Sequence, residues 1–231
     1  MQFFIIVLLA CFFIFLFCLY SVSHDDFLLI RRGIPEDSVF NIAFLLAFVS
    51  LFFSRLFWAI FHPTSNFFNP LYFLLFPYFP GLSLLGGIAG GGLFLYAIFK
   101  VKKMPAGRLL DLFTLSLIAS MPVGVVGYFF MAGYNFLSLS VIVTLVSYVF
   151  LFLIFAFFLF PRFTKGRIEE GSMATLFLIA FSAVSVLGRV VSGNFAFGPE
   201  NIILILLFLV SFAFYIQRGK LISKYIISRK K

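Results

Sequence analysis

The sequence predicts an all-α integral membrane protein with about seven transmembrane helices, N-terminus outside and C-terminus cytoplasmic, in a single domain over residues 1–231. Three observations predict this fold class. Hydrophobic residues make up 63% of the chain and charged residues only 11%, whereas ordinary globular proteins carry about 25% charged residues. Long uncharged stretches recur along the chain, and the basic residues gather in the segments between alternate stretches.

The uncharged stretches are long enough to be membrane spans. A helix needs about 20 mostly apolar residues to cross the hydrocarbon core, and stretches of this length are too long for barrel strands. The predicted spans cover residues 3–20, 39–61, 81–99, 109–131, 136–160, 173–193 and 198–217. Residues 62–80 contain four prolines, which exclude a continuous helix. Their aromatic residues predict an interfacial loop on or in the membrane surface.

The basic residues predict the orientation. Of 17 Lys and Arg residues, fifteen fall on one side of a seven-span topology and two lie inside spans. Positively charged loops favour the cytoplasm, which places the N-terminus outside. One span more or fewer would put basic clusters on both sides. The net charge of +9 therefore indicates a membrane surface rather than a nucleic acid as partner.

The two cysteines predict neither a disulfide framework nor a metal site, and they do not indicate the redox compartment. Cys11 and Cys18 both lie in the first span, where a thiol behaves as a small hydrophobe. Cys11 follows a Leu-Leu-Ala run similar to a lipoprotein cleavage site, but the basic segment of a signal peptide is missing. Neither a metal site nor a disulfide framework can be built from these two residues, and we expect no cofactor.

The two basic residues inside spans are Arg55 and Arg189. A charged side chain in a span is costly unless it snorkels, pairs or faces a polar cavity. Arg55 lies about six residues, roughly 9 Å, from the predicted outer end of its span, and Arg189 lies at a similar depth. Two guanidinium groups at this depth suit the phosphate of an anionic lipid headgroup, and independent snorkelling is the alternative. Asp111, near the cytoplasmic start of the fourth span, is expected to form a cap or pair with Arg108 or a nearby lysine, and a proton relay is the alternative role.

Small and polar residues also gather near the predicted outer side. The stretch "GLSLLGGIAGGGL" from Gly81 to Leu93 contains two overlapping small-xxx-small patterns, which allow close packing of helices in membranes. Ser83 is a candidate headgroup contact, and His62 is a weak candidate for a catalytic base. The glycines expected to pack or to line a cavity are Gly86, Gly87, Gly90, Gly91, Gly124 and Gly127.

The order of four motifs resembles bacterial prolipoprotein diacylglyceryl transferase over about residues 28–133. They are "RRGIPEDS", "SRLFWAIF", "GLSLLGGIAGGGLFLYAIFKVKKMPAGRLLDL" and "MPVGVVGYFF". The resemblance implies seven spans in the bacterial cytoplasmic membrane. It also implies transfer of diacylglyceryl from phosphatidylglycerol to a lipobox cysteine, with prolipoprotein signal peptides as partners. Arg55 in "SRLFW" matches the family's arginine.

The chain departs from this family where the chemistry lies. Leu85 stands in place of the family's histidine, and Val125 and Tyr128 replace the arginine and asparagine of its signature. Arg189 stands alone in the penultimate span, where the family has Arg and Glu residues. Leucine can neither deprotonate a thiol nor stabilise a leaving phosphate. Two hypotheses follow: a diverged transferase, or an inactive relative that binds anionic lipid or lipoprotein precursors. A small transporter is disfavoured because the sequence has no inverted repeat or broken-helix pair.

Overall fold

The computed structural model describes residues 2–24, 26–63, 81–131, 138–193 and 198–228, and these residues form helices and short connections. Seven of the helices are long and apolar enough to cross a membrane, so the chain is an all-α, multi-pass membrane protein. The predicted interfacial loop is described only at His62 and Pro63; residues 64–80 lie outside the described part of the chain.

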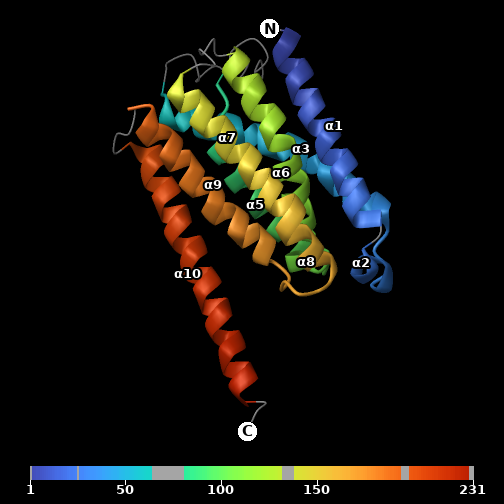
Figure 1. Ribbon diagram of the computed structural model, residues 1–231. Helices are drawn as coiled ribbons and strands as arrows, with labels where there is room; N and C mark the ends of the chain where they lie inside the picture. The colour runs from blue at the N-terminus through green and yellow to red at the C-terminus, as the bar shows by residue number, and fades with distance from the viewer. Residues whose placement is uncertain (1, 25, 64–80, 132–137, 194–197, 229–231) are drawn as a thin grey trace.

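The observed helices follow the predicted spans closely (Figure 1). Their bounds are α1 Gln2–His24, α2 Phe27–Arg31, α3 Glu36–Phe61, α5 Leu84–Val101, α6 Ala106–Met131, α7 Leu139–Leu153, α8 Phe160–Thr164, α9 Ser172–Val191 and α10 Pro199–Ser228. A π-helical segment, η2 (Ile154–Leu159), joins α7 to α8, so the predicted fifth span continues to Thr164. The third span was predicted to begin at residue 81, but its helix begins at Leu84, because Ser83 caps it.

Helix α6 lies at the centre of the packing. In its most apolar window 61% of the residues are buried, more than in any other span of the described chain. It contacts α1, α5, α7 and α9, while α3 packs mainly on α5 and α10 mainly on α9. Leu109, Leu112 and Ile118 of α6 are fully or almost fully buried. The outward faces of the other helices carry large apolar side chains, as expected where lipid is the solvent.

The bundle has two distinct ends (Figure 1). At one end α3 finishes and α5 begins; we call this the α3–α5 end. At the opposite end lie α2, α8, the α5–α6 turn and the α8–α9 turn. These connections carry the loop basic residues, so we call this the basic end. The C-terminal end of α9 and the start of α10 lie at the α3–α5 end of the bundle. The alternation of helix directions agrees with the predicted seven-span topology.

Candidate functional site

The glycines of α5 let it pack tightly against α3. A Cβ atom at Gly86 would lie 2.5 Å from Cβ of Phe57 and 2.7 Å from the carbonyl oxygen of Phe53. A Cβ atom at Gly90 would collide with the Phe53 ring, and one at Gly91 would come within 2.5 Å of the Ser50 hydroxyl. Both glycine patterns therefore face α3, and the missing side chains allow the two helices to pack closely.

Gly87 and Gly92 tolerate more than their neighbours. A Cβ atom at Gly87 would meet Ser50 and Ser54 at 3.6 Å, an ordinary van der Waals distance. A Cβ atom at Gly92 would meet nothing within 4 Å. The tight contact is thus concentrated on one face of α5, and Gly92 offers a matched position outside it.

Two serines fasten the start of α5 to α3. The Ser83 N–H donates to the Ser54 carbonyl at 3.0 Å, and the Ser54 hydroxyl donates to the Ser83 carbonyl at 2.8 Å. The Ser83 hydroxyl accepts a hydrogen bond from the Gly86 N–H and caps α5. Ser83 was predicted to contact a lipid headgroup; its observed contacts are those of a helix cap.

Arg55 follows Ser54 on α3 and lies beside these hydrogen bonds between Ser54 and Ser83. Its side chain is 1% exposed, and Nη1 donates to the carbonyl oxygen of Gly81 at 2.8 Å. Gly81 has a φ of 152°, and a Cβ atom there would collide with the Trp58 indole and lie 2.9 Å from Arg55 Nη1. Glycine is thus required at this position both for its backbone conformation and for the close approach to α3.

His62 ends α3 two helical turns beyond Arg55. Its backbone N–H donates to the Trp58 carbonyl at 2.9 Å, and its ring stacks on the indole with centroids 4.0 Å apart. The imidazole is exposed. Arg55, Trp58 and His62 recur at helical spacing on α3, so they form one row that runs from the buried cation to the exposed end of the helix.

Arg189 has a different set of partners from those found for Arg55. Its Nη2 lies 2.6 Å from Glu200 Oε2, and Nη1 donates to Asn201 Oδ1 at 2.9 Å. The two charged side chains are 35% and 19% exposed. Arg189 stood alone within its own span in the sequence, but the hairpin of α9 and α10 supplies an acidic partner.

Gly124 and Gly127 pack against α1. A Cβ atom at Gly124 would lie 3.5 Å from the Cys11 sulfur, and one at Gly127 would collide with the Val7 side chain. Gly124 and Gly127 therefore serve helix packing in the described structure. Of the three positions that depart from the resembled family, Leu85 and Val125 are buried with 4% and 8% exposure, and Tyr128 is 58% exposed.

The basic end holds a polar cluster that sequence reasoning missed. Asp26 caps α2 through Oδ1, which accepts hydrogen bonds from the N–H groups of Leu28 and Leu29. Its Oδ2 accepts from Arg108 Nε at 2.8 Å and lies 2.7 Å from Nη2. The guanidinium carbon lies 3.6 Å from the centroid of the Phe163 ring, a cation–π contact. The Asp-Phe-Leu-Leu pattern signals the cap, but it does not reveal the arginine 82 residues away.

Asp111 caps a neighbouring helix. Oδ2 accepts from the Gly171 N–H at 2.6 Å and Oδ1 from the Ala174 N–H at 2.9 Å, so the carboxylate satisfies the start of α9. The predicted cap is present, but on another helix, and Arg108 bonds Asp26. Among the described residues, no group of three His, Cys, Asp or Glu side chains has the geometry of a metal site.

Comparison with known proteins gives no relative for the chain. No protein-family model, curated protein or solved structure matches it. A functional proposal for this chain is therefore built on the residues and geometry described above.

Proposed function

We propose that this chain is a diacylglyceryl transferase-like membrane protein that binds phosphatidylglycerol through its headgroup at the α3–α5 end. The observation that carries the proposal is the buried guanidinium of Arg55 at the start of α5. Burying an arginine within a span is costly. Arg55 holds its guanidinium at the start of α5, where Nη1 donates to the Gly81 carbonyl. A lipid phosphate matches this group chemically, because it accepts two guanidinium N–H groups at once.

The burial of Arg55 determines how a phosphate would reach it. Because the side chain is only 1% exposed, the segment at Gly81 must move away from Trp58 before an anion contacts the guanidinium. That movement would exchange the Gly81 carbonyl for a phosphate oxygen. The N–H groups at the first turn of α5 carry the positive end of the helix dipole, which further favours an anion at this end.

Diacylglyceryl transfer is the catalytic extension of this binding. A base removes the proton from the lipobox thiol, the sulfur forms a bond to the glyceryl carbon, and the bond from that carbon to the phosphate oxygen breaks. Glycerol phosphate leaves with the bonding electrons, and its negative charge needs a cation nearby. Arg55 would stabilise the leaving phosphate, and exposed His62 on the same row of α3 is the candidate base.

Binding without transfer is the second candidate function. It is supported by Leu85 and Val125, which are buried apolar side chains at the positions where the resembled family has its histidine and arginine. Losing one electrostatic stabiliser of a transition state costs about 10²- to 10³-fold in rate. The same scaffold and Arg55 would then hold anionic lipid, or a lipoprotein precursor, without the reaction.

An assay with labelled phosphatidylglycerol and a lipobox peptide separates the two candidates. The purified full chain is incubated with both, and a complete diacylglyceryl transferase in the same detergent serves as the positive control. A thioether product that disappears in His62→Ala supports transfer. Retention of phosphatidylglycerol without product supports binding alone.

Variants of Arg55 test the shared binding step. Arg55→Gln removes the charge and Arg55→Lys keeps it, so retention of phosphatidylglycerol is expected to fall strongly in the first and partly in the second. Lys102→Gln, an exposed position at the basic end, is the matched control. Unchanged retention in a folded Arg55→Gln protein would overturn the proposed function.

A further inference from the structure

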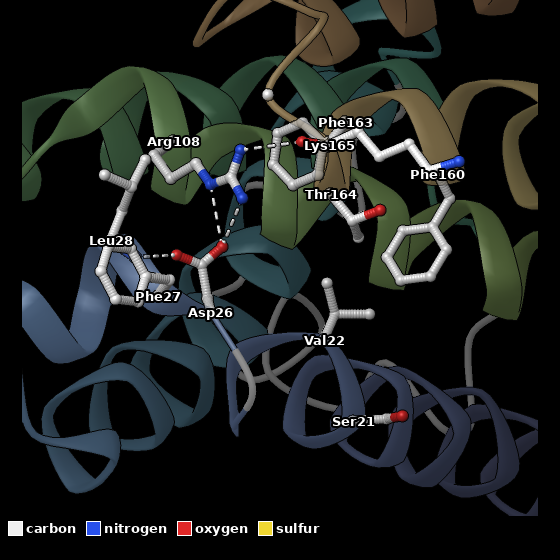
Figure 2. Close-up of a pocket in the computed structure, with 11 residues that line it drawn as sticks. Ser21, Val22, Asp26, Phe27, Leu28, Arg108, Phe160, Phe163, Thr164 and Lys165 are labelled. Carbon is white, nitrogen blue, oxygen red and sulfur yellow. Dashed lines mark hydrogen bonds and ion pairs between the residues drawn. The ribbon is translucent and has the colours of Figure 1, made fainter.

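A pocket of about 490 Å³ opens at the basic end (Figure 2), which is the opposite end of the bundle from the α3–α5 end (Figure 1). Its walls come from the end of α1, the start of α2, the start of α6 and the end of α8. Its volume lies in the range of about 300–1,000 Å³ that is typical of small-molecule sites. Three parts of the chain that are distant in the sequence, residues 21–28, Arg108 and residues 160–166, therefore enclose one space.

The back of the pocket is electrically neutral. The Asp26 carboxylate receives two backbone N–H groups and the Arg108 guanidinium, so its acceptor sites are occupied. The charges of Asp26 and Arg108 cancel, and the pair is rigidly held by the α2 cap and the Phe163 ring. The pair therefore holds the pocket walls together, and the net charge of the pocket is determined by its other lining residues.

Lys165 makes the pocket positive. It is exposed, and no ion pair with it occurs within the described ranges of the chain. Figure 2 shows its side chain reaching toward Phe160 and away from the Asp26–Arg108 pair. The Thr164 hydroxyl lies on the same side of the pocket as Lys165 and donates to the Pro161 carbonyl at 3.1 Å, and Ser21 lies farther along the pocket, past Val22. An ammonium group suits a phosphate, and the two hydroxyls can accept hydrogen bonds from further hydroxyl groups of the same ligand.

The rest of the lining is apolar and continues toward the membrane. Val22 and Phe160 line the pocket. Phe17 lies one turn before Ser21 on α1, and Phe157 lies about one turn before Phe160; both are at least 70% exposed. A polar mouth at the end of the spans, above an exposed apolar surface, has the layout of a lipid site, with a headgroup at the interface and chains in the hydrocarbon.

We propose that this pocket binds an anionic phospholipid from the leaflet at the basic end. Its phosphate lies against Lys165, the hydroxyls of its headgroup meet Ser21 and Thr164, and its acyl chains follow Phe17 and Phe157. The other basic residues of this end attract the same class of lipid to the surface. This site is independent of the proposed function at Arg55, because the two lie at opposite ends of the bundle.

Native mass spectrometry of the full chain in neutral detergent measures this binding, with phosphatidylglycerol as the probe and phosphatidylcholine as its neutral counterpart. Lys165→Gln is expected to weaken the affinity for one bound phosphatidylglycerol by about fivefold, the equivalent of about 1 kcal/mol per lysine near a membrane surface. Lys102→Gln removes a charge from the same end but not from the pocket and is expected to leave that affinity unchanged. Ser21→Phe keeps the charge and fills the pocket, and it is expected to weaken binding as well.

The controls decide between this proposal and simpler explanations. Equal losses in Lys165→Gln and Lys102→Gln would show general surface attraction and overturn the pocket site. Binding of inorganic phosphate with the same affinity would assign the site to a soluble anion. Phosphatidylglycerol bound at Arg55 is expected to shift the fluorescence emission of Trp58, whose indole faces Gly81, and Lys165→Gln is expected to leave that shift intact. Loss of the pocket site and loss of the proposed function at Arg55 therefore give different results.

Discussion

Both ends of the bundle hold a buried arginine, and the two are stabilised in different ways. Arg108 at the basic end is 7% exposed and bonds the carboxylate of Asp26, which also caps α2. Arg55 at the α3–α5 end is 1% exposed and donates to the neutral carbonyl of Gly81. An ion pair with filled acceptor sites is a fixed link between segments. The guanidinium of Arg55 instead donates to the backbone at the start of α5, where we propose that a lipid phosphate binds.

The largest expected effect concerns which end faces which side of the membrane. In a chain with Cys11 and Cys18 replaced by alanine, Ser192→Cys lies at the end of α9 and Lys102→Cys at the basic end. A membrane-impermeant maleimide applied to intact bacteria is expected to label Ser192→Cys and to reach Lys102→Cys only after lysis, because basic loops stay in the cytoplasm. The reverse pattern would invert the topology and place Arg55 near the cytoplasmic leaflet.

Removing one partner of the buried ion pair is expected to cost the most stability. Arg108→Ala leaves the Asp26 carboxylate buried without its cation, so the free energy of unfolding in detergent is expected to fall by about 3–5 kcal/mol. The double variant Asp26→Asn with Arg108→Met removes both charges and is expected to recover part of this loss.

Arg55→Gln gives the corresponding change in the free energy of unfolding at the α3–α5 end. It removes a hydrogen bond from a charged group to a carbonyl, worth about 1.5–3 kcal/mol, and is expected to destabilise the chain less than Arg108→Ala does. A larger loss at Arg55 would mean that this arginine is the main structural link and would weaken its assignment to a ligand.

The glycine contact at the α3–α5 end gives a smaller effect. Gly86→Ala places a methyl group against the Phe53 carbonyl and Phe57, and overpacking of this kind costs about 1–3 kcal/mol. Gly92→Ala on the same helix meets nothing and is expected to stabilise the chain by up to about 1 kcal/mol through helix propensity. Thermal unfolding of the two variants side by side measures the difference. Equal stabilities would show that the α3–α5 contact is looser than described.

The sequence predicted the elements whose cause is local. Spans follow from runs of apolar residues, and the packing of α5 follows from the spacing of Gly86, Gly90 and Gly91. The observed helix bounds agree with the predicted spans to within a few residues, apart from the extension of α10 to Ser228.

The polar contacts were harder to predict because they join segments that the fold brings together. Asp26 meets Arg108, and Asp111 caps a helix that begins 61 positions later, at Ser172. Arg189 meets Glu200 only because α9 and α10 form a hairpin. Ser83 was predicted to contact a headgroup, and the structure shows it as the N-cap of α5; a cap and a ligand contact favour the same residue type.

Trp58 gives the most direct test of phosphatidylglycerol binding at Arg55. It is the one tryptophan of the chain, it stacks on His62, and its indole faces Gly81. Because a phosphate reaches Arg55 only when Gly81 moves, titration with phosphatidylglycerol is expected to shift the Trp58 emission, whereas phosphatidylcholine is not. Arg55→Gln is expected to abolish the shift and Lys102→Gln to preserve it. The same shift in a folded Arg55→Gln protein, or with phosphatidylcholine, would contradict lipid binding at Arg55.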